Sequence, residues 1–180
     1  ESRRNEFSGP IDVLAIREAI VAFTKVCAEN NLPFYFGGHP AITPLVYRVA
    51  SQYTENKPLI KIYQSLYFEG QTPKEVEFFD NICWTKKVND DMLASVEAMR
   101  NQMFTENHTD CAVFIGGMKG IIDEANKIMK IHPLVKILPV ASTGGASFDL
   151  YRMMKLSDVE LLKSPAYVSL FREKLDFLIR

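Results

Sequence analysis

The 180-residue chain is 47% hydrophobic and 24% charged, which supplies enough apolar material for one compact domain with a substantial core. A formal net charge of -1 gives no basic field to attract a nucleic acid polymer or an anionic membrane, so any phosphate recognition must be local. No segment approaches the ~18 to 20 apolar residues of a membrane span, and the basic, polar start Glu1-Ser2-Arg3-Arg4 is not followed by the apolar region of a secretory signal. Cys27, Cys83 and Cys111 are widely spaced and odd in number, so we expect reduced core thiols and a cytoplasmic protein.

Hydrophobic periodicity and turn residues predict alternating helices and strands. In chain order, the first half is expected to form a helix over 11–29, a strand over 32–36, a helix over 41–53, a strand over 59–66, a loop with a short helix over 67–79, a strand over 82–85 and a helix over 92–105. The second half is expected to form a strand over 111–115, a helix over 121–129, a strand over 135–140, a helix over 148–154 and a helical pair over 159–180. Asp90 is expected to cap the helix over 92–105. Trp84, the only tryptophan, is expected in the core or at an interface.

Helices that alternate with apolar strands indicate a parallel sheet covered on both faces. We therefore predict a Rossmann-like α/β fold with an open parallel sheet and three α/β/α layers. The chain is expected to be a single domain over 1–180, with its core at about 11–155 and C-terminal helices at 157–180. Because the chain opens without methionine and stops inside a predicted helix, we expect it to be cut from a longer protein that carries an effector domain.

Glycines follow three of the predicted strands. They lie in Gly37-Gly38-His39-Pro40, in Gly116-Gly117-Met118-Lys119-Gly120 and in Ser142-Thr143-Gly144-Gly145. The turns that follow parallel strands lie on one edge of a sheet, so these segments are expected to converge. Glycine permits positive φ and close approach of a ligand, while the following helix offers free N–H groups and the positive end of its dipole, as phosphate binding requires. The alternative is that the glycines serve tight packing only.

The glycine turns do not match the common nucleotide-binding motifs. Neither G-x-G-x-x-G nor G-x-x-x-x-G-K-[ST] occurs, which disfavours NAD dehydrogenases and P-loop NTPases. A small nucleotide-type ligand bound in another mode remains the prediction, with no cofactor and no metal. His108 and His132 lie in loops without metal-ligand spacing, so we expect them to face solvent.

The segment Val113-Phe114-Ile115-Gly116-Gly117-Met118-Lys119-Gly120-Ile121-Ile122-Asp123-Glu124 resembles the SLOG superfamily, which includes the LOG phosphoribohydrolases and nucleotide-sensing domains of bacterial defence systems. Residues 116–124 resemble the P-G-G-x-G-T-x-x-E segment of LOG enzymes, and Met99-Arg100-Asn101 resembles their M-x-x-R-K segment. The resemblance implies that Arg100 and Glu124 are counterparts of the catalytic arginine and glutamate.

Several positions depart from the LOG pattern. Asn101 stands in place of the lysine, Ile115 in place of the proline, and Lys119 and Ile121 alter the glycine turn. These departures, together with the segments 37–40 and 139–146, make the resemblance closer to the sensor branch, whose domains bind NAD-derived or cyclic nucleotide signals.

Five further side chains are candidates for ligand contact. Arg100 would hold a phosphate or form an exposed ion pair. Glu124 would accept ribose hydroxyls, act as a base or compensate the helix dipole. His39 would donate to phosphate, stack on a base or cap the next helix. Ser65 would reach the crevice from the end of the second strand, and Lys119 would contribute a point charge to a phosphate.

Three functions are consistent with these residues. The first is a non-catalytic sensor of a nucleotide second messenger, of ADP-ribose or cyclic nucleotide type, which changes its homo-oligomeric state to switch an attached effector in antiviral signalling. The second is a phosphoribohydrolase that cleaves the N-glycosidic bond of a nucleoside monophosphate with Arg100 and Glu124. The third is a structural interaction domain without a ligand. The incomplete LOG motif favours the first.

Overall fold

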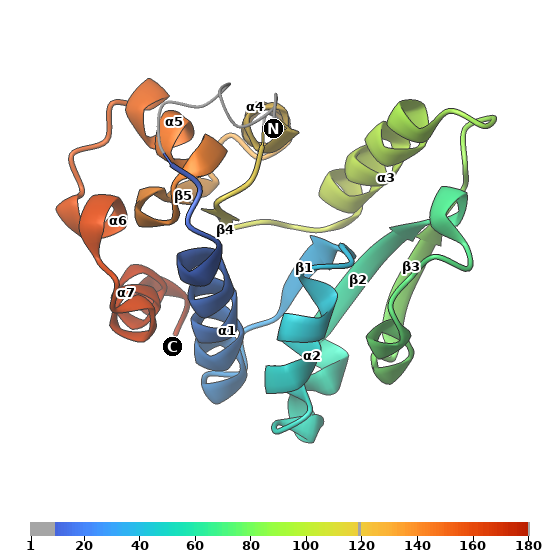
Figure 1. The fold of residues 1–180 in the computed structure, drawn as a ribbon, viewed down its shortest axis with the longest axis horizontal. Helices are drawn as coiled ribbons and strands as arrows, with labels where there is room; N and C mark the ends of the chain where they lie inside the picture. The colour runs from blue at the N-terminus through green and yellow to red at the C-terminus, as the bar shows by residue number, and fades with distance from the viewer. Residues whose placement is uncertain (1–9, 119, 180) are drawn as a thin grey trace. The chain divides into compact units, whose positions relative to one another are not determined.

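The computed structural model describes residues 10–118 and 120–179, which divide into two compact units. The first unit combines the described residues before Thr24 with Thr109–Leu178, and the second comprises Thr24–His108 with Ile179. Helix α1 (Val13–Glu29) contributes to both, because the unit boundary falls within it. Each unit consists of parallel strands with helices packed around them (Figure 1).

The second unit is built on a three-stranded parallel sheet in the order β1-β2-β3. The strands are β1 (Phe34–Gly37), β2 (Ile60–Ser65) and β3 (Asn81–Thr85). In the centre of the sheet, Ile62 and Tyr63 are fully buried, since β2 has a neighbour on either side. The helices of this unit are α2 (Thr43–Ala50) and α3 (Met92–Glu106), with 3₁₀ segments over Thr54–Leu59, Leu66–Phe68 and Lys74–Phe78.

Helix α3 packs against all three strands of this sheet and starts one residue later than the predicted cap implies. The Oδ1 atom of Asp91 accepts a hydrogen bond from the N–H of Ala94 at 3.0 Å, which is the geometry of an N-cap. The prediction that Asp90 caps this helix is therefore wrong. The backbone of Asp91 has the extended conformation of the capping position, and Asp90 forms an ion pair with Lys87 at 3.0 Å.

The first unit contains a two-stranded parallel sheet of β4 (Cys111–Ile115) and β5 (Lys136–Val140). Helix α5 packs against β5, and helix α4 packs against β4 and α5. The helices are α4 (Gly120–Ile131), α5 (Gly145–Met153), α6 (Val159–Lys163) and α7 (Tyr167–Lys174), with 3₁₀ segments over Ala141–Thr143 and Asp176–Leu178. The buried core of this unit includes Val140, Leu150 and Phe171, whose ring meets that of Phe23 edge to face at 5.5 Å.

The predicted fold class is confirmed. Parallel sheets of three and two strands with helices around them are consistent with a three-layer α/β/α Rossmann-like fold. Nearly every predicted element is present, with bounds shifted by a few residues. That the two units act as a single domain stays a prediction. Within the described residues, no helix has the length and apolar character needed to cross a membrane. The three cysteines are free, with Cys27 buried and the other two partly exposed.

Candidate functional site

Two of the three glycine turns come together in the first unit. Thr143 Oγ1 accepts a hydrogen bond from the N–H of Gly116 at 2.8 Å. Both the N–H and the hydroxyl of Ser147 donate to the carbonyl of Gly116, at 3.0 and 2.8 Å, and the N–H of Ala146 donates to the carbonyl of Gly117 at 3.1 Å. These bonds fix the turn after β4 against the turn after β5, as the parallel arrangement of the strands predicts.

The glycines of these two turns are required by the fold itself. Gly116, Gly117, Gly144 and Gly145 have φ values of 58°, 83°, 73° and 60°, in the left-handed region that side chains disfavour. A Cβ on Gly145 would lie 2.6 Å from the carbonyl oxygen of Gly117, and a Cβ on Gly116 would lie 2.3 Å from Ile16 Cδ1. Packing therefore explains these glycines without a ligand, so substituting them tests the fold first.

The two helix N-termini at these turns differ in what they offer to an anion. In the first turn of α5, the N–H groups of Ala146 and Ser147 already donate to the backbone carbonyls of the other turn. Helix α4 begins at Gly120, directly after the turn, and its N-terminus carries the positive end of the helix dipole. Met118 is exposed in this turn, whereas Lys119 lies outside the described residues. In α4 the N–H of Ile121 donates to the Met118 carbonyl of the preceding turn at 2.9 Å, whereas in α5 both N–H groups bond to the other glycine turn.

Glu124 follows one turn into α4, where its side chain is half-buried. The neighbouring Asp123 is exposed and lies in the first turn of the same helix. The two acids therefore differ in surroundings although they share a helix, which makes them a natural matched pair for mutagenesis.

The two hydroxyls that follow β5 have separate roles. Thr143 is completely buried, and its hydroxyl donates to the carbonyl of Val140 at 2.6 Å while accepting from Gly116. Ser142 is half-buried and its hydroxyl lies 3.4 Å from the hydroxyl of Tyr167. The predicted ligand-binding role therefore has a structural basis for Ser142, whereas Thr143 holds the two turns together.

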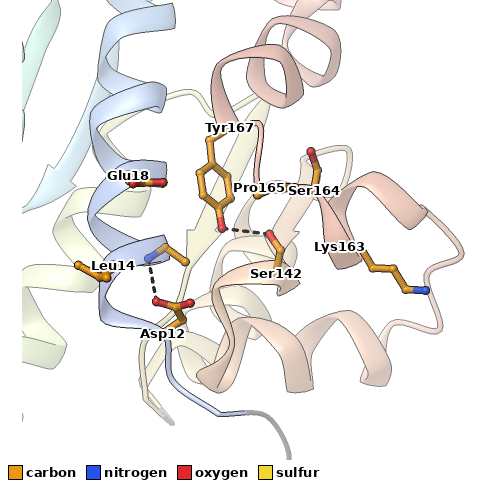
Figure 2. A pocket seen from close by; sticks show the side chains of 9 residues that line it. Asp12, Leu14, Glu18, Ser142, Lys163, Ser164, Pro165 and Tyr167 are labelled. Carbon is orange, nitrogen blue, oxygen red and sulfur yellow. Dashed lines mark hydrogen bonds between the residues drawn. The ribbon is translucent and has the colours of Figure 1, made fainter.

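A pocket of about 230 Å³ opens beside Ser142 (Figure 2). It lies between the start of α1, the 3₁₀ segment after β5 and the connection between α6 and α7. Its lining residues are Asp12, Leu14, Ala15, Glu18, Ser142, Lys163, Ser164, Pro165 and Tyr167. The N–H of Asp12 donates to the carbonyl of Thr143 at 3.3 Å, so the start of α1 is tied to the glycine turns.

The pocket wall combines acceptors of hydroxyl groups with one cation. Asp12 and Glu18 supply carboxylates and Ser142 and Tyr167 supply hydroxyls, while Lys163 also lines the pocket with its ammonium group directed away from them in Figure 2. Asp12 Oδ1 accepts from the N–H of Ala15 at 2.9 Å, which orients the carboxylate. This set suits a ligand that carries several hydroxyl groups and a negative charge, such as a sugar phosphate. Its volume is below that of most drug-sized sites, so a whole nucleotide would extend beyond it.

The third glycine turn belongs to the second unit and differs from the other two. Gly37 and Gly38 do not have positive φ. A Cβ on Gly38 would lie 2.1 Å from the side-chain nitrogen of Gln64, so Gly38 is required for space. His39 is exposed, and its Nδ1 accepts a hydrogen bond from the N–H of Ala41 at 3.1 Å. Ala41 precedes α2, whose N-cap is Ile42 without a side-chain cap, so His39 orders the turn before the helix and does not cap it.

The remaining predicted side chains of the second unit are Ser65 and Arg100. Ser65 is fully buried and its hydroxyl accepts from the N–H of Tyr67 at 3.2 Å, so it caps the 3₁₀ segment after β2. Burial at this position leaves no surface for a ligand, which corrects the expectation that Ser65 reaches the crevice. Arg100 is half-buried on α3.

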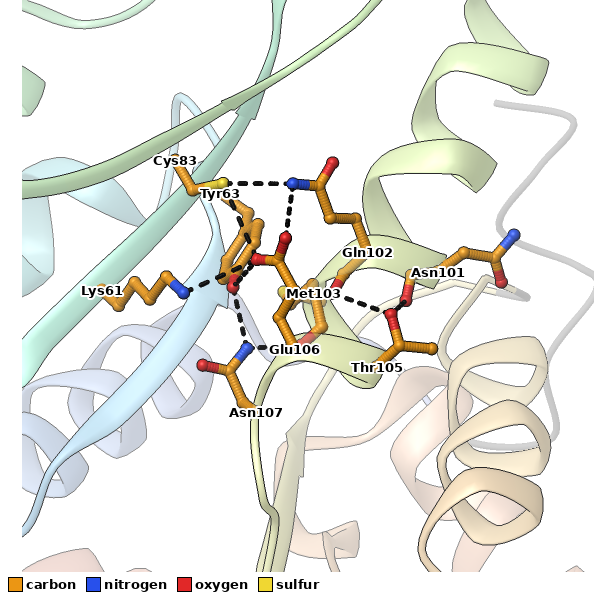
Figure 3. Close-up of polar contacts among 9 residues, drawn as sticks. All are labelled: Lys61, Tyr63, Cys83, Asn101, Gln102, Met103, Thr105, Glu106 and Asn107. Carbon is orange, nitrogen blue, oxygen red and sulfur yellow. Dashed lines mark hydrogen bonds and ion pairs between the residues drawn. The ribbon is translucent and has the colours of Figure 1, made fainter.

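A polar cluster that the sequence analysis did not single out lies where the end of α3 meets β2 and β3 (Figure 3). The hydroxyl of the buried Tyr63 donates to Glu106 Oε2 at 2.8 Å and accepts from Asn107 Nδ2 at 2.9 Å. Lys61 Nζ lies 3.7 Å from the same carboxylate oxygen, and Gln102 Nε2 donates to Glu106 Oε1 at 2.8 Å. The cluster fixes the C-terminal turn of α3 to the sheet.

The packing of this cluster shifts the pKa values of two of its groups. Hydrogen bonds from Tyr63 and Gln102 and the nearby Lys61 hold the pKa of the Glu106 carboxyl below its usual value. Burial and the Glu106 carboxylate raise the pKa of the Cys83 thiol.

Two histidines in loops were predicted to face solvent, and no metal site was predicted. His108 is exposed, as expected, and His132 is partly buried. Within residues 10–118 and 120–179, no group of three or more metal-ligating side chains is close enough together to hold a metal ion.

Comparison with known protein families decides the relationship. The model of the SLOG cluster3 family matches residues 6–175 of the chain. The chain belongs to this family. The match confirms the resemblance inferred from the glycine turn after β4, and it covers nearly all 180 residues of this chain. No curated protein and no solved structure matches it. SLOG membership associates the chain with a nucleotide-related function.

Among the pocket side chains proposed to contact a ligand, sequence reasoning missed Asp12, Glu18, Lys163 and Tyr167. Asp12 had a local signal, since an aspartate directly before a helical pattern is an N-cap candidate. Lys163 and Tyr167 flank the Ser164-Pro165 break between two short helices, and nothing in that segment indicates that it packs beside residue 142.

Proposed function

We propose that the chain is a non-catalytic sensor domain for a nucleotide-derived second messenger of ADP-ribose or cyclic nucleotide type. It acts in the cytoplasm and changes its self-association to control an attached effector in antiviral signalling. The observation that carries the proposal is the joining of the two glycine turns of the first unit beside a polar pocket. Family membership supports a nucleotide as the ligand class.

The ligand divides between two adjoining features of the first unit. The phosphates bind at the N-terminus of α4, where Gly117 and Met118 lead into the helix. The ribose hydroxyls enter the pocket, where Asp12 and Glu18 accept their hydrogen bonds and Lys163 neutralises an adjacent phosphate. Adjacent residues support this division, because Ser142 lines the pocket and Thr143 bonds to Gly116.

Binding without turnover is the central test. Thermal-shift and calorimetric titration against ADP-ribose, cyclic ADP-ribose, NAD, AMP and cyclic dinucleotides should identify a stabilising ligand that chromatography recovers unchanged. A ligand present at about a hundred times its Kd stabilises the folded state by about 2.7 kcal/mol, which is readily measured. If no member of the panel stabilises the protein, the proposal fails.

A matched pair of variants tests the location of the site. Glu124→Gln removes a half-buried charge on α4, and Asp123→Asn removes an exposed charge on the same helix. If Glu124 accepts a hydrogen bond from a ribose hydroxyl next to these phosphates, Glu124→Gln weakens binding about tenfold or more, as the loss of a charged hydrogen bond does. Asp123→Asn should leave affinity nearly unchanged. Equal losses in both variants would show a general field effect and refute the contact.

The alternative is a LOG-like phosphoribohydrolase in which Arg100 holds the phosphate and Glu124 polarises the ribose or activates water. The family relationship favours keeping this candidate, since SLOG domains are similar to LOG enzymes. Chromatography of nucleoside monophosphates incubated with the protein separates the two functions. Release of the free base that disappears in Glu124→Ala supports hydrolysis, whereas an intact nucleotide supports the sensor.

A further inference from the structure

The three-stranded sheet of the second unit ends at β3, which pairs with β2 and with no other strand among the described residues. An edge strand presents backbone N–H and C=O groups to which another strand can add, and monomeric proteins commonly protect such edges with lysine or proline. The five residues of β3, Asn81-Ile82-Cys83-Trp84-Thr85, include no charged residue and no proline. The strand therefore lacks the usual protection.

Exposed apolar side chains alternate with charged ones at and after this edge. Trp84 is 41% exposed, and among the exposed large hydrophobic side chains of the described chain it is the one that belongs to a strand. Val88, Met92 and Leu93 follow closely in sequence and are exposed as well. Exposed aromatic and methionine side chains beside an unpaired strand are typical of a protein–protein contact.

We propose that β3 is the contact strand of a homodimer, in which it pairs antiparallel with β3 of a second copy around a twofold axis at Cys83. In this register Ile82 lies opposite the partner's Trp84, an aromatic and β-branched pair of the kind that stabilises antiparallel strands. Asn81 lies opposite the partner's Thr85, so no like charges meet within the strand. The two sheets join into one sheet of twice the width.

Charge complementarity at the strand ends identifies the partner as a second copy and selects the register. Asp80 directly precedes β3 and Lys86 directly follows it. Antiparallel pairing around Cys83 sets Asp80 opposite the partner's Lys86, and the twofold axis repeats this contact. A shift of the axis to Ile82 or Trp84 would set both of these charges opposite apolar residues.

The charged groups at these ends are accessible. The Asp80 side chain is 62% exposed and contacts Lys57 through one oxygen, Oδ1, at 2.8 Å. Lys86 is exposed. Both can therefore meet a partner without unfolding any described element.

The inference rests on the proposed function in one respect only, since a sensor that acts through self-association needs a surface on which copies meet. The pairing of β3 uses residues 80–86 of the second unit, and the proposed ligand contacts lie in the first unit. Failure of ligand binding and failure of the β3 contact are therefore measured separately.

Oxidative crosslinking of the full chain tests the register. Directly opposed residues of antiparallel strands have Cα atoms about 4.5 to 5.5 Å apart, within the range of a disulfide. Copper phenanthroline at mildly alkaline pH should give a covalent dimer whose crosslinked peptide contains Cys83, and Cys83→Ser should abolish it. Cys27 is buried, and burial raises the pKa of the Cys111 thiol to about 12, so both serve as internal controls. A dimer that persists in Cys83→Ser overturns the register.

Charge exchange provides a second test that does not depend on the thiol. In sedimentation velocity over a wide concentration range, the unmodified chain should dimerise, whereas Asp80→Lys and Lys86→Asp should each remain monomeric. A mixture of the two variants should dimerise, because one chain then carries two lysines and the other two aspartates at the strand ends. Circular dichroism checks that both variants fold. A chain that is monomeric at every concentration, or single variants that dimerise like the unmodified chain, overturns the proposal.

Discussion

Replacement of Thr143 by valine tests how the two glycine turns are held together. Valine has nearly the shape of threonine but no hydroxyl, so Thr143→Val removes the acceptor of the Gly116 N–H and the donor to the Val140 carbonyl. Because Thr143 is completely buried, water cannot replace either bond. The substitution isolates the hydroxyl from the shape of the side chain.

The expected loss follows from these two bonds. A buried donor left without a partner costs about 1–3 kcal/mol, and each lost hydrogen bond contributes about 0.5–1.5 kcal/mol, so Thr143→Val should lower the free energy of unfolding by about 2–4 kcal/mol. For a chain of this length, that corresponds to a fall in Tm of about 4–16 °C. The measurements are thermal melting and urea unfolding followed by circular dichroism.

Two control substitutions sharpen the result. Thr143→Ser keeps the hydroxyl and removes one methyl group, which should cost about 1 kcal/mol. Ser142→Ala removes a hydroxyl from the pocket wall, where the side chain is half-buried, and should change stability by less than about 1 kcal/mol. If Thr143→Val is as stable as Thr143→Ser, the hydroxyl does not hold the turns together and the reasoning is wrong.

Three further substitutions or measurements follow from the first unit. Gly144→Ala should lose roughly 3 kcal/mol or more, seen as a lower urea midpoint, because φ is 73° and a Cβ would lie 1.7 Å from the Pro10 carbonyl oxygen. Burial alone would raise the pKa of Asp158, but hydrogen bonds from Lys174 and backbone N–H groups outweigh it, so the pKa is lowered from 3.8. The Asp158–Lys174 contact therefore stabilises the folded state above pH 3.8, and this stabilisation is lost as the pH falls through the lowered pKa of Asp158. Asp158→Asn should reduce the difference between the urea midpoints at pH 7 and pH 3. The Cys111 thiol, with a pKa of about 12, should resist maleimide at pH 8 until urea unfolds the protein.

The fold was predictable because its signals are local. The strands over residues 111–115 and 136–140 are apolar runs bounded by turns, and both the sequence and the structure place them there within a residue. The cap of α3 was misassigned to Asp90 because two adjacent aspartates have the same capping chemistry. The backbone conformation decides between them, and it depends on how the loop from β3 enters the helix.

The candidate site was predictable only in part. The turns at Gly116 and Gly144 were found because positive φ and close backbone approach leave a glycine signature in the sequence. Ser65 and Thr143 were assigned to a ligand because a hydroxyl after a strand suits a ligand and a cap equally well. The structure separates these roles through burial, which a sequence does not contain.

Glycines that the fold itself requires are weak evidence of ligand binding. At Gly117 a Cβ would lie 2.0 Å from Ile121 Cδ1, so selection for folding alone would keep glycine there. Ligand binding depends on polar side chains that the fold does not need for its stability. Glu18 and Lys163 in the pocket wall are such side chains. Because Glu18 and Lys163 are exposed, Glu18→Gln and Lys163→Met should leave the free energy of unfolding within about 0.5 kcal/mol of that of the unmodified chain. If both also leave ligand affinity unchanged, the pocket is not the ribose site, whatever the glycine turns bind.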